Sequence, residues 1–158
     1  QIEAEDLGAA EATARRLLDV LNDSPNSPVT RAVMSPALYL ALIHQRRGEQ
    51  AESERWLGRL DAFRDALIDS APDDKTGHLL SARIASIRGN REAMLDALRA
   101  AAQRGLRGDW LLRTDPTFAQ WRDDRLFQAF LAELRRQGAA LRAELSQSKE
   151  GTALMARD

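Results

Sequence analysis

The side chains of this chain that are best suited to catalysis or metal binding are those of two histidines, His44 and His78. A protein zinc site needs three or four convergent ligands, and the sequence has neither an HExxH pattern nor any cysteine to complete one. We therefore predict no metal site and no cofactor. Each histidine is expected to line a groove or to cap a helix.

Acidic side chains are the second candidate for chemistry. They occur in short groups: Glu3/Glu5/Asp6, Glu52/Glu54, Asp73/Asp74 and Asp123/Asp124. Each group suits the first turn of a helix, where negative charge complements the helix dipole, or a solvated helix face. No nucleophile elbow, phosphate-binding loop or dinucleotide motif is present. We expect no catalytic residue and no enzyme, and only a cluster of ionisable groups with strongly perturbed pKa values in one cleft would favour one.

Four arginines surround the turn that precedes Trp110: Arg99, Arg104, Arg107 and Arg113. They could bind an acidic segment of a partner protein. The favoured interpretation is that they pair with Asp109 and Asp115 and bind the last carbonyl groups of a helix. The three tryptophans, Trp56, Trp110 and Trp121, are expected in the core or the cap, and a partly exposed one would be a binding anchor.

The composition is that of a globular domain without a strong electrostatic preference. The chain has 158 residues, 44% of them hydrophobic and 30% charged, with a net charge of −1. No whole-molecule field therefore favours nucleic acid, and no apolar run approaches the ~18 residues of a membrane span. Lysine accounts for only two residues, Lys75 and Lys149, among 23 basic ones, which is typical of a GC-rich bacterial genome.

The strongest pattern is a repeat that begins at three glycines, Gly8, Gly48 and Gly89, at intervals of 40 and 41 residues. The residues five, nine and twelve positions after each glycine fall on one helical face. They are Thr13, Leu17 and Val20, then Ser53, Leu57 and Leu60, then Met94, Leu98 and Ala101. A helical face that recurs at a fixed interval is typical of stacked helix pairs, because one pair cannot bury its apolar face alone. An ordinary helix bundle is the alternative.

Capping residues and apolar periodicity predict the helices. The expected ranges are 3–21, 36–47 after a Ser35 cap, 49–70, a helix capped by Asp74 or Thr76 that ends at Arg88, 91–104, a short helix from Pro116 through Trp121, and 125–146. The buried face of helix 49–70 is expected to comprise Trp56, Leu57, Leu60, Phe63, Leu67 and Ile68. In the last helix Phe127, Phe130, Leu131, Leu134, Leu141 and Leu145 are expected to face inward.

Two segments resemble the tetratricopeptide-type repeats of bacterial signalling proteins. Residues 35–48 are similar to the first helix of that repeat, and residues 89–101 to its glycine-led second helix. Residues 110–118 and 122–127 look like the segment that closes many such arrays. The interval of 40–41 residues departs from the family's period of about 34, and bulky Met94 replaces a small residue. Both departures alter the groove.

The resemblance implies a right-handed superhelix of antiparallel helix pairs with a C-terminal capping helix. We expect one domain over residues 1–146, with 106–146 as the capping segment and 147–158 as a flexible tail. The first repeat is expected to be truncated, with the parent protein continuing upstream of Gln1. The family is found in the C-terminal part of membrane-anchored winged-helix transcription regulators, which implies scaffolding or sensing in the cytoplasm or periplasm of a bacterium.

The leading functional hypothesis is a non-catalytic module that binds a peptide or a partner helix in its concave groove. The residues expected to line this groove are Tyr39, Gln45, Arg46, His78, Arg83 and Ser86. The alternative is a sensor domain of a transmembrane regulator that binds a small ligand or dimerises. No nucleic acid is expected to bind through this domain, and a homodimer is possible.

Overall fold

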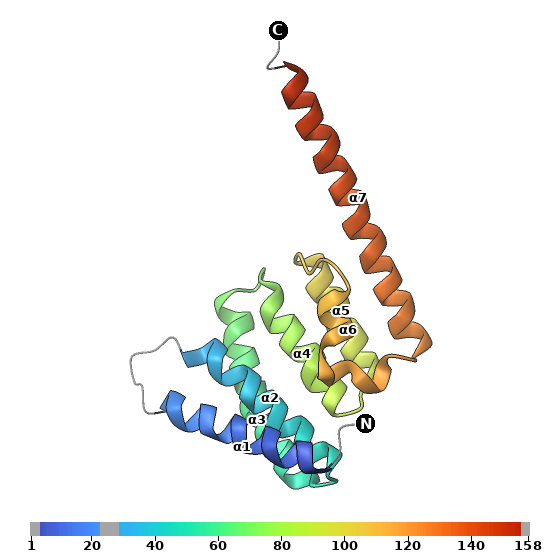
Figure 1. Ribbon diagram of the computed structural model, residues 1–158. Helices are drawn as coiled ribbons and strands as arrows, with labels where there is room; N and C mark the ends of the chain where they lie inside the picture. Colours follow the sequence, from blue (N-terminus) through green and yellow to red (C-terminus); the bar gives the residue numbers. More distant parts are fainter. Residues whose placement is uncertain (1–3, 23–28, 156–158) are drawn as a thin grey trace. The chain divides into compact units, whose positions relative to one another are not determined.

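The computed structural model describes residues 4–22 and 29–155 (Figure 1). Every regular element in these residues is a helix and none is a strand, which confirms the all-α prediction. The elements are α1 (Ala4–Asn22), α2 (Val29–Arg46), α3 (Gln50–Ser70), α4 (Lys75–Ile87), α5 (Arg91–Gln103), α6 (Trp110–Thr114), the 3-10 helix η1 (Pro116–Trp121) and α7 (Arg125–Met155). None of these helices combines the length and apolar character needed to cross a membrane.

The chain divides into two compact units, residues 1–104 and residues 105–158. The first contains α1 to α5, and the second contains α6, η1 and α7. The division falls next to residue 106, where the capping segment was expected to begin.

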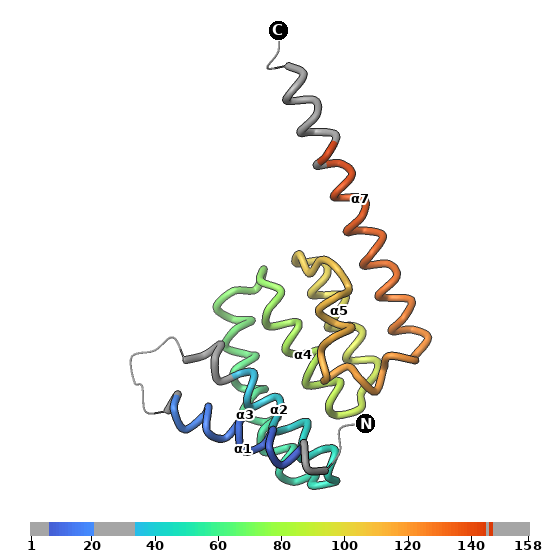
Figure 2. Tube along the Cα trace, viewed as in Figure 1, coloured from blue at the N-terminus to red at the C-terminus, as the bar shows by residue number. Residues whose placement is uncertain are grey.

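In the first unit each helix packs against the next one in the chain, and α2 also contacts α4 (Figure 2). One apolar cluster joins three helices, with Ala41 of α2, Leu57 and Leu60 of α3, and Ile84 of α4 among its buried members. Helix α4 approaches α3 closely at Gly77, where a Cβ atom would lie 2.6 Å from Cγ1 of Ile68. The first unit is therefore a series of neighbouring helices with a shared core.

The turns at Gly48 and Gly89 have the same geometry. Both glycines have positive φ, 75° and 73°. The N–H of Glu49 donates to the carbonyl of His44 at 2.9 Å, and Asn90 N–H donates to the Ala85 carbonyl at 2.9 Å. This bond pattern is the Schellman helix ending, for which glycine is the preferred residue because it has no Cβ atom. Two of the three glycines thus have the equivalence that the repeat predicts.

Gly8 does not share that role, although the predicted helix over residues 3–21, which contains it, is confirmed by α1. It lies inside α1 and its φ is not positive. Its neighbours are alanine, leucine and acidic residues with good helix propensity, so the helix continues through the glycine. The first repeat therefore differs from the other two, since its glycine is not in a turn and Leu17 and Val20 are exposed where Leu57 and Leu60 are buried.

Helix α2 also begins earlier than expected. The prediction used Ser35 as a cap and Pro36 as the first helical residue, but α2 starts at Val29 and Pro36 lies within it. A proline inside a helix removes one backbone hydrogen bond. Here Pro36 is buried beside Ala37 and Leu38, which are 4% exposed, so its side chain contributes to packing in compensation.

In the second unit, aspartates begin the helices as the sequence predicts. Asp115 accepts a hydrogen bond from the Thr117 N–H at 2.9 Å, directly ahead of Pro116. Asp124 accepts from the N–H groups of Leu126 and Phe127 at 2.9 and 3.0 Å. These bonds satisfy helix donors that have no partner within the helix.

Helix α7 is longer than predicted and only partly packed. It runs to Met155 rather than to residue 146. Phe127, Leu131 and Leu134 are buried as expected, with the ring of Phe127 stacked 5.8 Å from that of Phe118. Leu141, which was expected to face inward, is 42% exposed. Within this unit α6 and η1 are short, so they cover only the first part of α7 (Figure 1). The side chain of Leu145 lies outside the described ones.

Candidate partner-binding surfaces

Helix α2 presents one narrow exposed face, which we call the α2 strip and define as Ser35, Tyr39 and Arg46. Tyr39 is 45% exposed although most residues around it, from Ala37 to Ile43, are buried. Tyr39 and Arg46 are seven residues apart and therefore share one side of the helix. Within the described residues, neither side chain takes part in a hydrogen bond or an ion pair. The strip thus has an aromatic ring and a guanidinium group that remain available.

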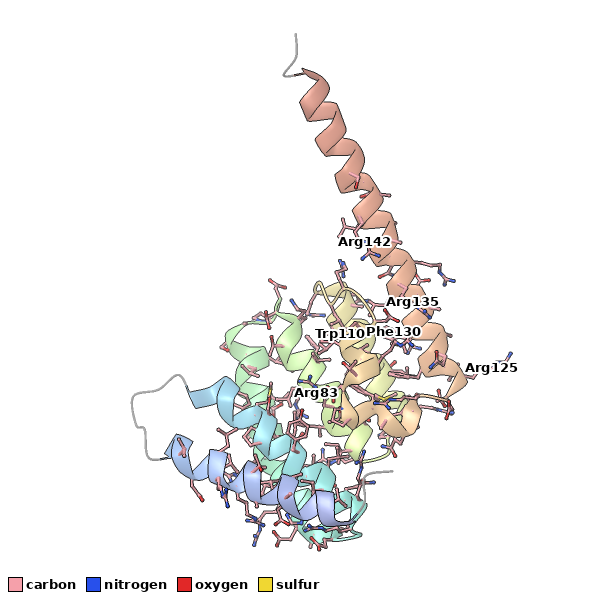
Figure 3. All side chains as sticks on the ribbon, viewed as in Figure 1. Arg83, Trp110, Arg125, Phe130, Arg135 and Arg142 are labelled. Carbon is pink, nitrogen blue, oxygen red and sulfur yellow. The ribbon has the colours of Figure 1, made fainter. Side chains whose placement is uncertain are left out.

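The other predicted groove residues do not join this strip. Gln45 is six residues from Tyr39, which places it about 120° away around α2. His78 and Arg83 are five residues apart and point about 140° from one another around α4. Arg83, labelled in Figure 3, is part-buried and already has an interaction within the chain.

Ser86 was expected in the groove, and this prediction is wrong because the residue is fully buried. It shares the face of α4 that carries Leu79 and Ala82, which are 8% and 0% exposed. The spacing of these three residues is the helical one, so the same packing that covers the two apolar residues covers the serine.

His78 lies beside this buried face, because it is four residues before Ala82, and its half-buried side chain is near Arg104, which follows α5. Burial lowers the pKa of its imidazole, and the positive charge of Arg104 lowers it further. Arg104 itself donates from Nε to the Pro72 carbonyl at 2.7 Å and from its guanidinium to the Ala100 carbonyl at 3.2 Å. The bond to Pro72 connects α5 to the loop between α3 and α4. Both bonds confirm the favoured interpretation that Arg104 binds backbone carbonyl groups.

The remaining arginines of that cluster have local partners too. Arg99 pairs with Asp96 at 2.6 Å, and Arg113 lies 3.6 Å from Asp109. Arg135 of α7 also reaches Asp109, at 3.2 Å. The favoured interpretation, local pairing, is therefore confirmed for Arg113.

His44 is a second buried histidine, 4% exposed. Its Nδ1 atom is in hydrogen-bond contact with the carboxylate of Glu49, the residue that precedes α3. Its Nε2 atom and that of His78 have no hydrogen-bond partner among the described residues. Over the same residues, no group of three or more His, Cys, Asp or Glu side chains could hold a metal ion.

A hollow of about 300 Å³ lies between α1 and α3. It is lined by Arg15, Leu18, Asp19, Trp56 and Arg59. The guanidinium of Arg59 lies 4.9 Å from the centre of the Trp56 ring, within cation–π range, and the buried indole Nε1 has no acceptor among the described residues. The sequence analysis missed this site, although a Trp and an Arg three positions apart on one helix were a readable signal.

Trp110 is not in the core. It is 72% exposed, the largest value among the described large apolar side chains, and therefore meets the condition set for a binding anchor. Figure 3 labels it together with Arg135 and Phe130 of the same unit. Trp56 and Trp121 are partly buried.

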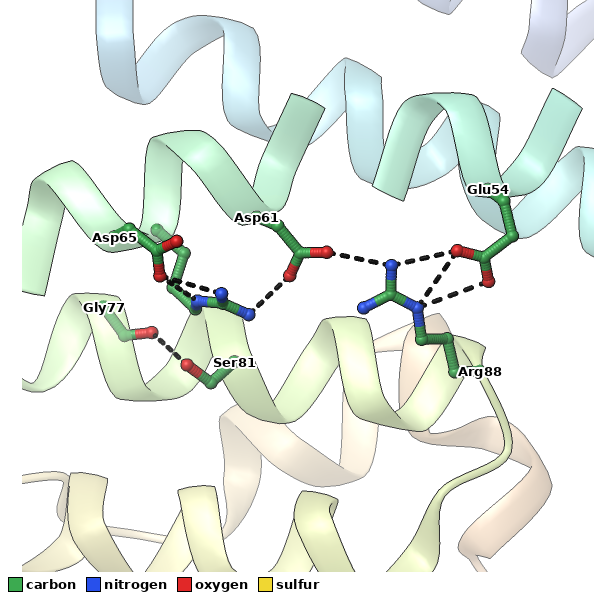
Figure 4. A network of polar contacts seen from close by, with 7 residues as sticks. Glu54, Asp61, Asp65, Gly77, Ser81 and Arg88 are labelled. Atoms are coloured by element: carbon green, nitrogen blue, oxygen red, sulfur yellow. Dashed lines mark hydrogen bonds and ion pairs between the residues drawn. The ribbon is translucent and has the colours of Figure 1, made fainter. Parts of the chain in front are cut away.

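An ion-pair network joins α3 to α4 (Figure 4). Arg88 binds the carboxylates of Glu54 and Asp61 at 2.9 and 2.8 Å, and Arg64 pairs with Asp61 and with Asp65. The hydrogen bonds to Glu54 raise the pKa of Arg88, and those to Asp61 raise it further. The carboxylates are thus neutralised by Arg88 across the contact between the two helices and by Arg64 within α3.

Comparison of the chain with known protein families, with characterised proteins and with solved structures gives no match. The arrangement of surfaces described above is therefore the basis for any functional assignment.

Proposed function

We propose that this chain is a non-catalytic protein–protein interaction module whose helix pairs stack as in tetratricopeptide-type repeats. In this proposal it is the C-terminal part of a larger bacterial signalling or regulatory protein. A peptide or partner helix binds along the α2 strip. The observation that carries the proposal is that Tyr39 and Arg46 are exposed and have no hydrogen-bond or ion-pair partner within the described residues, on a helix whose residues 36–38 and 40–44 are buried.

The chemistry of the strip supports protein binding. Tyrosine and arginine are enriched among the residues that contribute most to protein interfaces, because each combines contact area with directional hydrogen bonds. Helix α2 is held by α1, α3 and α4, so the two side chains extend from a rigid element. A rigid surface loses little conformational entropy on binding, which favours affinity.

Two features support the repeat architecture. The turns at Gly48 and Gly89 have the same hydrogen-bond pattern, and they separate helices that recur at the predicted interval. The first helices of the two complete pairs, α2 and α4, contact each other as well as their own partners. Such contacts are expected where successive pairs stack to form a continuous core.

The experiment is affinity capture with the tagged chain, followed by measurement of the dissociation constant with each purified partner. Tyr39→Ala and Arg46→Ala are each expected to weaken binding by about tenfold or more, as for interface residues that contribute most to affinity. Arg55→Ala is the matched control, because Arg55 is an arginine of α3 whose side chain is 70% exposed. A folded Tyr39→Ala/Arg46→Ala variant with unchanged affinity would overturn the assignment of this surface.

The hollow between α1 and α3 favours a second candidate function, a ligand-sensing domain of a transmembrane regulator. Its volume of about 300 Å³ is at the lower end of the range for small-molecule sites. Neither the Asp19 carboxylate nor the Arg59 guanidinium has an ion-pair partner within the described residues, so a small zwitterion is the fitting ligand class. In this case Arg59→Ala would abolish ligand binding, whereas changes in the α2 strip would leave it intact.

A further inference from the structure

The three glycine-led helices α1, α3 and α5 share one apolar register but differ in how it is covered. In α3 the residues five, nine and twelve positions after Gly48 are 1%, 1% and 3% exposed, and in α5 the equivalent residues after Gly89 are all 0% exposed. In α1 the equivalent Leu17 and Val20 are 46% and 66% exposed, and Thr13 is exposed as well. We call Thr13, Leu17 and Val20 the α1 stripe.

The covering element in α3 is the helix that precedes it. Leu57 and Leu60 lie in one apolar cluster with Ala41 of α2. The Ser53 hydroxyl donates to the Ala41 carbonyl at 2.9 Å, and this bond is buried. Helix α5 likewise packs against its preceding helix, α4, where Ala82 is 0% exposed. In both α3 and α5 the residues of this register are therefore covered by the preceding antiparallel helix, which has a fully buried alanine, Ala41 or Ala82.

Helix α1 has the register without such a neighbour. A different face of α1, about 110° away around the helix and carrying Ala14 and Leu18, packs against Leu40 of α2. On the stripe, the Thr13 hydroxyl turns back to the Ala9 carbonyl of its own helix at 2.9 Å, where Ser53 instead donates to another helix. The stripe is thus an exposed apolar helix face, and the packing of α2 on α3 shows how a helix covers the equivalent face.

We propose that the α1 stripe binds an amphipathic helix of a partner protein, in the antiparallel arrangement that α2 adopts on α3. The bound helix has a small residue at the crossing point, as Ala41 is at that of α2, and Leu or Ile around it. It also carries an acidic residue opposite Arg16. Arg16 occupies the repeat position of Trp56, is exposed, and has no ion-pair partner within the described residues.

The charge of Arg16 favours a partner helix over a second copy of this chain. Two α1 helices paired antiparallel along the stripe would be centred between Arg16 and Leu17, the middle of the stripe. Such a pair would bring two Arg16 side chains to within about one helical turn of the symmetry axis, where like charges repel. An acidic partner helix removes that repulsion and replaces it with attraction.

The probe is a fluorescein-labelled peptide of residues 29–47, the α2 sequence, with Leu40→Glu. Leu40 belongs to the apolar cluster against which Trp56 packs, so a carboxylate at its position should lie near Arg16, which occupies the repeat position of Trp56. In fluorescence anisotropy with the full chain, Leu17→Glu is expected to weaken binding at least tenfold. Arg16→Ala is expected to remove the several-fold advantage of this peptide over the one that retains Leu40. Leu126→Glu is the matched control, because Leu126 is a similarly exposed leucine at 51% on α7.

A second measurement covers the case in which the free peptide is too weak to detect. The same helix is joined through a flexible linker ahead of Gln1, which raises its effective concentration to the millimolar range. Hydrogen exchange at the α1 amides is expected to slow, and Leu17→Glu is expected to restore it. Unchanged exchange in the joined form, or peptide binding that Leu17→Glu leaves intact, would overturn the proposal. So would a dimer in sedimentation equilibrium that Leu17→Glu dissociates, since it would assign the stripe to a second copy.

Discussion

Helices α1 and α3 have the same apolar spacing and different surroundings. Helix α3 lies between α2 and α4, and it contacts both through the cluster that contains Leu57 and Leu60. Ion pairs from Arg88 add a polar connection to α4. Helix α1 packs through Ala14 and Leu18, the only described residues of α1 that are buried.

The difference shows that an apolar pattern sets which face can be buried, while the neighbouring helices decide how much free energy that face contributes. Hydrophobic stabilisation is proportional to the area removed from water, at about 25 cal/mol per Å². An exposed leucine in a matching position therefore contributes little. Helix α1 relies more on local terms, namely its alanines and the Arg15–Glu11 pair four residues apart.

The largest expected effect comes from shortening the same repeat position in the two helices. Leu57→Ala is expected to lower the free energy of unfolding by about 2–5 kcal/mol, because a fully buried leucine is replaced by a cavity. Leu17→Ala is expected to change it by less than about 0.5 kcal/mol. Urea denaturation followed by circular dichroism measures both. Equal losses would mean that the α1 stripe is covered in solution, and the comparison would fail.

A smaller effect, of opposite sign in the two helices, is expected one turn earlier. Ser53→Ala removes the buried bond to the Ala41 carbonyl and should cost about 1 kcal/mol. Thr13→Ala removes only an exposed bond within α1, and the better helix propensity of alanine should stabilise the protein by up to about 0.7 kcal/mol. The same denaturation experiment gives both signs. A loss of stability in Thr13→Ala would show that its hydroxyl has a partner outside α1.

Local signals made much of the fold predictable. Glycines at 48 and 89 ended helices, and Asp74, Asp115 and Asp124 began them, because each signal acts within a few residues of itself. Gly8, the first glycine of the repeat, lies inside α1, as the predicted helix over residues 3–21 implies. Pro36 is the exception, since it lies inside α2 rather than at its start.

The candidate site was less predictable from the sequence. The spacing of residues shows which of them share a helix face, but not which face other helices bury. Tyr39 and Arg46 lie on one face of α2. Ser86 and His78 were assigned to the groove without knowledge of where α5 lies, and packing buries Ser86 fully and His78 partly. Trp110 was expected in the core or the cap, yet the short elements of its unit leave it 72% exposed.

The smallest expected effect tests the polar attachment of α1. The carboxylate of Glu11 receives hydrogen bonds from Arg15 and from Arg47, which follows α2, and these hold its pKa below the usual 4.5. Because the folded state binds this proton less tightly than the unfolded state, the pair stabilises the protein above about pH 4.5. That stabilisation disappears as the pH falls through the lower pKa of the folded state.

Glu11→Gln is therefore expected to be less stable than the original chain at pH 7, by under about 1 kcal/mol because solvent screens a partly exposed pair. The difference should shrink in acid below the folded-state pKa. Urea midpoints at pH 7 and in acid measure it, with Glu133→Gln as the control, since the partners of Glu133, Arg136 and Gln137, lie in the same helix and its side chain is about half exposed. If Glu11→Gln lowers the free energy of unfolding equally at both pH values, then the charge of Glu11 does not hold α1 in place. Its apolar packing against α2 would be responsible instead. In that case α1 and α3 would differ only in how much apolar surface they bury. The ion pairs of Glu11 and Arg88 would then contribute little to holding either helix.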